Sequence, residues 1–341
     1  MTVQMDKYKV CIRCITYNHS EYITDALNGF AFQQTDFPFI ILLMDDASTD
    51  GEQEVIKAYI DEHFDLSDTQ TSYTKDTDDA EIIYARHKTN TNCYIAALCL
   101  KTNHYQAGKD KIQYVKQWRN ASDYEAICEG DDYWIDPLKL QKQVDFLDAN
   151  PQCGLSYTEA VIVNEDPSKV VRRWTKGVTK NICQHLMIKG NPIVTASVCV
   201  RRPLYDEYIR EQATFEVKAR MGDVPLWVYI TKDHPVHYCK DKTVAYRVLA
   251  NSASHSPDPQ KLRDFYRNSL DIKIYMNRRY NIGVSETRMW RGYYKTIIRT
   301  MCGYSRKHMW EAVKEVAVKS PLALFDLKVI FYLAKRCILN K

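Results

Sequence analysis

The run FPFIILLM at residues 37–44 constrains the fold more than any other stretch of the chain. It is apolar at nearly every position and ends directly in the turn sequence DDASTDG at 45–51. A strand that is apolar on both faces and bounded by turn residues is typical of the centre of a parallel sheet, where helices cover both faces. We therefore expect an α/β sheet built around this strand.

Strand and helix patterns alternate around this run. Strands are predicted at YKVCIRCI (8–15), AEIIYAR (80–86) and DYEAIC (123–128), and helices at SEYITDALNGF (20–30), EQEVIKAYIDEHF (52–64) and CYIAALCLK (93–101). Ser20 is placed to cap the first of these helices. The polar stretch 102–122 interrupts the alternation and is interpreted as a surface insertion. Alternation over roughly 130 residues predicts an open sheet flanked by helices.

The second half of the sheet region has weaker patterns. Asp136 and Pro137 are expected to cap and begin a helix, PLKLQKQVDFLDAN. Further strands are predicted at CGLSYTEAVIV (153–163), IVTASVCV (193–200) and HYCKDKTVAYRV (237–248), with GDVPLWVYI (222–230) between the last two. From about residue 258 the pattern is helical to the end. The expected domains are therefore a sheet domain over 1–257 and a basic helical region over 258–341.

The net charge of +4 conceals an asymmetry between these regions. Residues 261–341 carry 18 Lys and Arg against 6 Asp and Glu, so this segment is +12 and the preceding part is −8. A basic segment beside an acidic body suggests an anionic partner, either nucleic acid or the inner leaflet of a membrane.

The final segment, PLALFDLKVIFYLAKRCILNK (321–341), is apolar but interrupted by charges. Its longest uncharged run is six residues, against about 20 needed to span a bilayer. An amphipathic helix fits better, with Leu322, Phe325, Val329 and Leu333 on one face. Such a helix could pack on the core or lie on a membrane, and both alternatives stay open here.

Two features bear on the compartment. The first residues, MTVQMDKYKVCIRC, lack the basic head and sustained apolar run of a secretory signal. The 11 cysteines are scattered without the spacing of a disulfide framework, which is typical of reduced thiols. Cytoplasmic localisation is the expectation, with a peripheral contact on the inner face of the cell membrane left open.

Two acidic clusters each follow directly on a predicted strand. They are DDASTD at 45–50 and EGDD at 129–132. Since ligands bind at the carboxyl ends of strands in an open α/β sheet, both clusters are expected to face one crevice. The first cluster resembles the start of an EF-hand loop, but Lys57 stands where the bidentate Glu is required. The second could be a solvated turn, or could hold Mg²⁺ or Mn²⁺ together with substrate phosphates.

In order and spacing, these motifs resemble the family 2 glycosyltransferases, which have the GT-A fold. The likeness covers roughly residues 8–250. CITYNHSEYITDAL resembles the opening strand and helix of the family, LLMDDASTD its nucleotide-binding turn, and EGDDYWIDPLKLQKQVDFL its DXD region. MGDVPLW and VAYRV resemble the later acceptor-side helix and closing strand. The resemblance implies a Rossmann-like open mixed sheet, with a nucleotide-sugar half over 1–132 and an acceptor half over 133–257.

Carried over to this chain, the family pattern implies roles for the first loops. Thr16 and Tyr17 would lie beside the nucleotide, and Asp45 and Asp46 would contact its base and ribose. Ala47 departs from the pattern, since the family usually has Gly there.

The pattern also implies a metal site and a base. Glu129 and Asp131 occupy the two ends of DXD, where the family usually has Asp first. Asp131 would be the main metal ligand, with Glu129 and Asp132 beside it. Asp223 matches the general base, which must take the proton of an attacking hydroxyl. Without the resemblance, an N-cap role at the start of a helix is an equally good interpretation of Asp223.

Four more residues are candidates for substrate or phosphate contact. Trp134 and Trp227 could stack on sugar faces, although core packing is the commoner fate of aromatic residues. Arg247 and His255 fall where the family places phosphate-contacting residues on a loop.

The resemblance implies an inverting hexosyltransferase that uses a divalent metal, manganese or magnesium, in polysaccharide biosynthesis. It would move a sugar from a nucleotide diphosphate sugar, UDP-linked by expectation, to a glycan or lipid-linked glycan. A sugar-nucleotide nucleotidyltransferase is the nearest rival, but TYNHSEY follows the first strand where that class has a Gly-rich basic loop. A nucleic-acid-binding protein that uses the +12 segment is the other rival, and the −8 body argues against nucleic acid as a partner.

Overall fold

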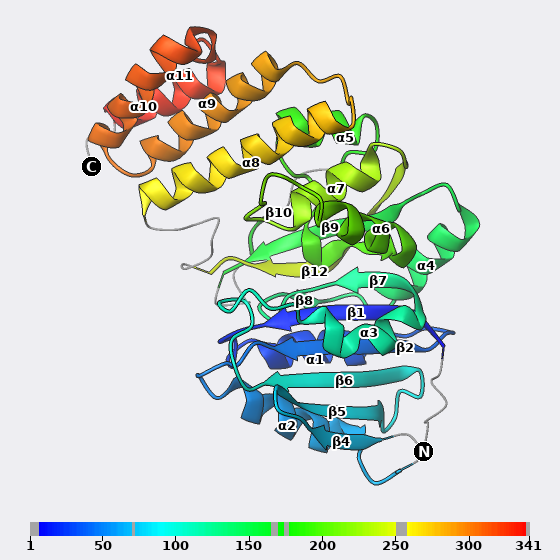
Figure 1. Cartoon of the computed structure of the whole chain (residues 1–341). Helices are drawn as coiled ribbons and strands as arrows, with labels where there is room; N and C mark the ends of the chain where they lie inside the picture. The colour runs from blue at the N-terminus through cyan, green and yellow to red at the C-terminus, as the bar shows by residue number, and fades with distance from the viewer. Residues whose placement is uncertain (1–6, 70–71, 165–169, 174–176, 250–257, 339–341) are drawn as a thin grey trace. The chain divides into compact units, whose positions relative to one another are not determined.

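The computed structural model describes residues 7–69, 72–164, 170–173, 177–249 and 258–338 (Figure 1). The chain divides into two compact units. The first comprises Met1–Thr179, Pro192–Glu207 and His234–Val248. The second comprises Lys180–Asn191, Tyr208–Asp233 and Leu249–Lys341. Segments 180–191 and 208–233 of the expected sheet domain thus cluster with the C-terminal helices.

The first unit is built on one mixed sheet. Its strands are β1 (Tyr8–Thr16), β2 (Phe39–Asp45), β3 (Phe64–Asp65), β4 (Tyr73–Asp76), β5 (Ala80–His87), β6 (Cys93–Leu100), β7 (Ser122–Ile127), β8 (Tyr133–Trp134), β9 (Leu155–Val163), β10 (Val170–Arg173), β11 (Cys199–Arg201) and β12 (Val236–Arg247). Their order is β3-β5-β6-β2-β1-β7-β11-β9-β12-β8, with β4 paired to β5 and β10 to β9. The pairs among β6, β2, β1 and β7 are parallel. β5 and β11 flank these four strands in antiparallel pairs.

Helices cover both faces of this sheet. Helices α1 (Ile23–Ala31), α2 (Glu52–His63) and α4 (Lys139–Ala149) pack on one face. Helix α3 (Ile112–Asn120) packs on the other face (Figure 1). All seven residues of β2 are buried, because both faces of this central strand are covered. The predicted fold class, an open mixed sheet flanked by helices, is confirmed.

The prediction of a helix at 93–101 is wrong. Residues 93–100 form β6, which pairs with β2 on one side and β5 on the other. All eight of its residues are buried. A short, fully apolar run has no periodicity that separates a buried strand from a buried helix, so pairing with the neighbouring strands decided its structure.

The stretch 102–122 is more than a surface insertion. It contains α3, whose Val115 and Trp118 are buried against the sheet. The Trp118 indole stacks on Tyr84 with ring centroids 5.8 Å apart. The apolar residues of this short helix lie among polar and charged ones, so the helix does not stand out in the sequence.

Two predicted helix starts are also displaced. α1 begins at Ile23 without a side-chain cap, and the backbone N–H of Ser20 donates instead to Asp50. α4 begins at Lys139, while Asp136 accepts from the N–H of Leu138 in the preceding turn. In both places a polar side chain stabilises the loop before the helix rather than its first turn.

The second unit is helical. It contains α5 (Ile182–Ile188), α7 (Asp223–Thr231), α8 (Pro259–Arg279), α9 (Glu286–Cys302), α10 (Arg306–Lys319) and α11 (Leu327–Ile338). The residues of α6 (Arg202–Gln212) are shared between the units. The predicted helical region from 258 is confirmed. None of the helices in the described ranges combines the length and the apolar character that a membrane span requires.

The expected apolar face of the last helix is only partly correct. Val329 is buried in a cluster formed with α9 and α10, and Leu333 packs against that cluster. Leu322 and Phe325 are exposed instead. Both precede α11, because the chain forms a short 3₁₀ turn at Pro321–Ala323 before the helix begins, so they do not continue its face.

Candidate functional site

The two acidic loops of the first unit meet at Thr16. This residue ends β1 and stands in register with Asp45 at the end of β2. Its hydroxyl donates to the carboxylate of Glu52, just beyond the DDASTD turn. A Cβ on Gly130 would lie 2.1 Å from the same hydroxyl oxygen, so the EGDD loop approaches this closely only because Gly130 has no side chain. Both clusters therefore lie at one sheet edge, and the expectation that they face one crevice stays a prediction.

Asp45 has one carboxylate oxygen without a partner. Its Oδ1 accepts from the N–H of Ser48 at 3.1 Å and from Gln53 Nε2 at 2.5 Å. Its Oδ2 is fully buried and has no hydrogen-bond partner in the described part of the chain. A buried, unpaired acceptor is costly unless a ligand donates to it. This oxygen is therefore an unsatisfied acceptor at the sheet edge.

The Asp46 carboxylate is fully engaged by another loop. It accepts from the N–H of His104 at 2.7 Å, the N–H of Tyr105 at 3.0 Å and Lys111 Nζ at 2.6 Å. Burial alone would raise the pKa of Asp46, but these hydrogen bonds outweigh it and lower the pKa below the ordinary value. Asp46 thus anchors the segment before α3 to the DDASTD turn.

Glu52 is a site residue that the sequence reasoning missed. Besides Thr16, it accepts from the N–H of His19 and the hydroxyl of Ser48, both at 2.8 Å. It is fully buried, and this burial raises the pKa of its carboxyl. The residue joins the loop after β1 to the loop after β2. An acid in the first turn of a helix is too common to identify this role from the sequence.

The departure at Ala47 has a conformational consequence. Ala47 lies in the left-handed region with φ of 61°, where an L-residue with a Cβ is strained. The family pattern has Gly at this position, and Gly adopts this conformation without that cost. Ala47 is therefore a strained position in this turn.

The carboxylates of the EGDD loop differ in their surroundings. Asp132 is buried and accepts from the N–H of Arg247 at 2.8 Å. Burial raises its pKa well above the ordinary value, and the charges of Asp131 and Glu129 raise it further. Asp131 and Glu129 are themselves only half-buried. The Asp131 carboxylate makes no hydrogen bond or ion pair within the ranges that the structure describes.

Arg247 holds this loop from β12. It is buried, its guanidinium lies 2.8 Å from Asp25 Oδ2, and it donates to the carbonyl of Asp131 at 2.5 Å. It also lies over the rings of Tyr22 and Tyr133. The other expected phosphate contact, His255, lies outside the described residues.

The loop fits a hard divalent cation. Such an ion takes one or two protein carboxylates and completes its shell with waters and substrate phosphate oxygens. Asp131 is available for this, with Glu129 near it, whereas Asp132 is occupied by the backbone of Arg247. Among the described residues no three His, Cys, Asp or Glu side chains converge to form a complete protein cage.

The aromatic candidates differ in their exposure to solvent. Tyr17 is exposed beside Thr16 at the sheet edge. Trp134 is buried against Phe30, and its indole N–H donates to the carbonyl of Ala196. Trp227 is also fully buried. Both tryptophans therefore belong to the core, the commoner of the two alternatives, and neither face is open to a sugar.

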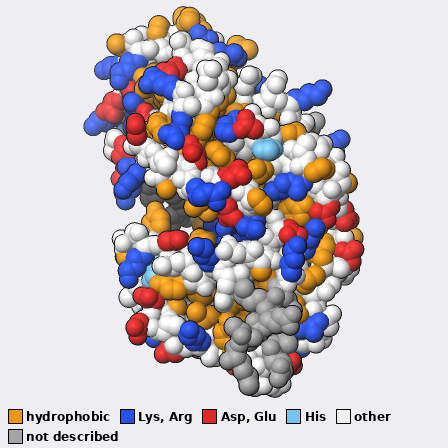
Figure 2. Space-filling model, turned by 45° about the vertical axis from the view of Figure 1, so that its right-hand side comes forward, with side chains coloured by type: hydrophobic (Ala, Val, Ile, Leu, Met, Phe, Trp, Pro, Cys, Tyr) orange, Lys and Arg blue, Asp and Glu red, His pale blue; other side chains and the backbone are white. Residues whose placement is uncertain are grey.

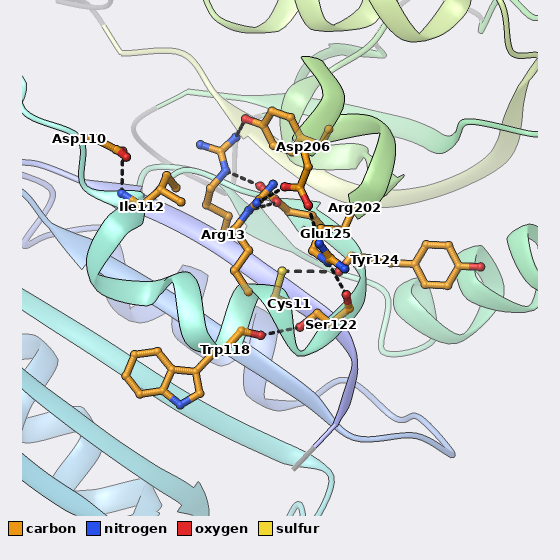
Figure 3. A network of polar contacts seen from close by, with 12 residues as sticks. Cys11, Arg13, Asp110, Ile112, Trp118, Ser122, Tyr124, Glu125, Arg202 and Asp206 are labelled. Atoms are coloured by element: carbon orange, nitrogen blue, oxygen red, sulfur yellow. Dashed lines mark hydrogen bonds and ion pairs between the residues drawn. The ribbon is translucent and has the colours of Figure 1, made fainter. Parts of the chain in front are cut away.

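A buried ionic network supports β1 and β7 on the α3 side of the sheet (Figure 3). Glu125 is fully buried between two arginines, 2.7 Å from Arg13 Nε and 2.6 Å from Arg119 Nε. Arg119 pairs with Asp206, and Arg13 donates to the hydroxyl of Tyr205. Because breaking a buried pair leaves an uncompensated charge, this network holds β7, which leads into the EGDD loop, against β1, which ends at Thr16.

Asp223 belongs to the second unit and is the first residue of α7. Its Oδ2 accepts from Asn191 Nδ2 at 2.9 Å, and burial raises the pKa of its carboxyl. It lines a cavity of about 360 Å³ together with Lys273 of α8 and the rings of Tyr266 and Tyr293. Burial lowers the pKa of Lys273 to about 8. The sequence reasoning missed Lys273, which lies among many other basic residues.

No protein-family model matches the chain. Two curated relatives are Rv1520 of Mycobacterium tuberculosis H37Rv and Mb1547 of Mycobacterium bovis, both described as uncharacterized proteins. Each is 32% identical over 194 residues, which is 57% of this chain and 47% of the relative. The chain thus spans about half the length of these relatives.

Among solved structures, the chain resembles residues 1–349 of Staphylococcus aureus TarS in complex with UDP-GlcNAc. The TM-score is 0.51 at 16% identity, covering 96% of this chain and 79% of that one. The mannosyltransferase PcManGT of Pyrobaculum calidifontis, in complex with GDP-Man and Mn²⁺, aligns with a TM-score of 0.46 at 13% identity over 100% of this chain and 91% of that one. The likeness to TarS shows a shared fold.

Proposed function

We propose that this chain is a metal-dependent, inverting glycosyltransferase. It moves a sugar from a nucleotide diphosphate sugar, UDP-linked, to a hydroxyl of a glycan or lipid-linked glycan in cell-surface polysaccharide synthesis. One observation carries the proposal: the two acidic loops meet at Thr16, where Asp45 has an unpaired buried oxygen and Asp131 an uncommitted carboxylate. The shared fold with a protein that binds UDP-GlcNAc supports the same donor class.

We assign the nucleotide to the loops after β1 and β2. The unpaired Oδ2 of Asp45 suits an N–H group of the nucleobase, because a buried carboxylate oxygen is an acceptor only. Tyr17, exposed beside it, offers a ring for stacking. Asp46 acts through the segment that it anchors, because its own carboxylate already accepts three hydrogen bonds.

We assign the diphosphate to the EGDD loop. Asp131 with Glu129 would hold Mg²⁺ or Mn²⁺, and the ion would neutralise the diphosphate that these acids would otherwise repel. Arg247 lies on β12 and positions the loop by two hydrogen bonds. Its guanidinium donates to the carbonyl of Asp131, and its backbone N–H donates to the carboxylate of Asp132.

The proposed base is Asp223. Its carboxylate would take the proton from the acceptor hydroxyl as the new glycosidic bond forms and the bond to the nucleoside diphosphate breaks. Attack opposite the leaving group inverts the anomeric carbon. The raised pKa of Asp223 makes it a stronger base than an exposed aspartate, and Asn191 orients it.

A donor screen tests the proposal. Release of UDP or GDP from each nucleotide sugar is measured with Mn²⁺, with Mg²⁺ and with a chelator. The expected result is metal-dependent release from one donor, lost by at least about 100-fold in Asp131→Asn and in Asp223→Asn. Glu311→Gln, a change at an exposed acid of α10, is the matched control and should leave activity unchanged. Full activity of the Asp131 variant would refute the metal assignment.

A further inference from the structure

One face of helix α9 is lined with cations. Arg288, Arg291, Lys295 and Arg299 recur every three or four residues, which places them on a single side of the helix. With Lys189 and Lys328 they line a cavity of about 420 Å³ within the second unit. Six basic side chains therefore surround one space, which we call the basic cavity.

The basic cavity is largely uncompensated. Asp326 is the one carboxylate among its lining residues, and it pairs with Lys295 at 2.6 Å. The other five cations make no ion pair with any residue that the structure describes, although Arg299 lies over the ring of Tyr332 at 5.2 Å. So many like charges around one space destabilise the fold unless an anion binds between them.

Large apolar side chains stand exposed directly beside this charge. Phe325 and Leu327 are 75% and 82% exposed, and they alternate along the chain with Asp326 and Lys328, which line the cavity. Further exposed apolar residues close to them in sequence are Leu322, Ile330 and Phe331. Figure 2 shows hydrophobic side chains interspersed with Lys and Arg on the part of the surface that the C-terminal helices form.

We propose that this surface binds an anionic lipid bilayer, with lipid phosphates in the basic cavity and Phe325 and Leu327 in the interfacial region. The proposal concerns attachment and holds whether or not the chain transfers sugars. Cations supply the attraction to anionic headgroups and exposed apolar side chains gain by leaving water, so the combination is specific for a charged bilayer. A nucleic acid would satisfy the cations but would leave the apolar side chains exposed. A second copy of the chain would bring like charges together.

Vesicle sedimentation tests the proposal. The full chain is mixed with phosphatidylcholine vesicles that contain or lack phosphatidylglycerol, and binding is expected only to the anionic vesicles. Arg288→Glu combined with Arg291→Glu should weaken this binding by roughly 100-fold or more. Phe325→Ser combined with Leu327→Ser should weaken it by at least about tenfold. All four side chains project from the surface or line the open cavity, so folding should be retained, which circular dichroism checks.

Matched controls lie on α10. Lys307→Glu combined with Lys314→Glu alters the same number of charges outside the cavity, and Val318→Ser alters an equally exposed apolar residue. Both should lose much less binding than the corresponding test variants. Equal losses in test and control variants, or insensitivity to the Phe325 and Leu327 changes, would overturn the proposal. The proposal would also be overturned if inorganic phosphate, but not chloride at the same ionic strength, released the protein completely from the vesicles. The basic cavity would then be a site for the free phosphate ion.

Discussion

Lys111 Nζ lies 2.6 Å from Asp46 Oδ2, and both side chains are almost completely buried. Asp46 follows directly on β2, whereas Lys111 directly precedes α3, 65 residues further along the chain. Two backbone N–H groups of the intervening segment donate to the same carboxylate. The ion pair therefore fixes one wall of the proposed nucleotide site.

Replacing Lys111 by Met should weaken the attachment of the segment before α3 to Asp46. The variant leaves the Asp46 charge buried without its cation, so the free energy of unfolding should fall by about 3 kcal/mol. Affinity for the nucleotide should fall with it, by roughly tenfold, because the segment is no longer held in place. Denaturant unfolding and calorimetric titration with UDP measure the two effects. Lys101→Met breaks an exposed pair with Asp76 and should cost less than about 1 kcal/mol; equal losses would contradict the argument.

Ala47→Gly should stabilise the protein. At φ of 61°, removing the Cβ relieves strain of about 1 kcal/mol, partly offset by the greater entropy of Gly in the unfolded chain. The midpoint of chemical unfolding should rise. Ala149→Gly, at the exposed end of α4, has no such strain to relieve and should lower the midpoint. A loss of stability in the Ala47 variant would contradict the strain argument.

Lys139 should make stability depend on pH. It is fully buried in α4, where its Nζ donates to Gln143 at 2.7 Å and lies over the Trp134 ring. Burial lowers its pKa from 10.5 to about 8. The unfolded chain thus binds a proton between pH 8 and 10.5 that the folded chain does not, so stability rises with pH across this window.

Comparison with Lys139→Met isolates this effect. At pH 7 the lowered pKa corresponds to a cost of roughly 3 kcal/mol, which the variant removes. The variant should therefore be the more stable protein at pH 7, and the difference should shrink as the pH approaches 10. Unfolding by urea at several pH values provides the measurement. A difference that does not change with pH would show that Lys139 is not buried in its charged form.

The assignment of Asp223 as the base predicts the pH at which activity falls on the acidic side of the pH–rate profile (the acid limb). Asp223 must be deprotonated to accept a proton, and its pKa is raised, so activity should fall at a higher pH than the ordinary value of 3.8 for Asp. The Asn191 hydrogen bond and the Lys273 charge both lower that pKa. Asn191→Ala and Lys273→Met should therefore each move the limb to higher pH, and Lys273→Arg should restore it. A limb that stays in place in all three variants would exclude Asp223 as the titrating group.

The central strand and the positions of the acidic loops could be predicted from local pattern in the sequence. A run as apolar as 37–44 can be stable only where both faces are covered, and turn residues directly after a strand must lie at the sheet edge. Both inferences depend on neighbours in the chain, so local pattern was enough. The same holds for the helical region from 258, where apolar residues recur at helical spacing over a long segment.

Other features depend on long-range contacts that local pattern does not predict. Residues 93–100 became a strand because β2 and β5 pair with them on both sides. Glu52, Lys111 and Gly130 acquired their roles from partners 36, 65 and 114 residues away, respectively. The burial that shifts the pKa values of Asp223 and Lys139 likewise comes from packed elements. Such contacts leave no periodic signal, because they depend on which surfaces the fold brings together and not on the order of residues along one element.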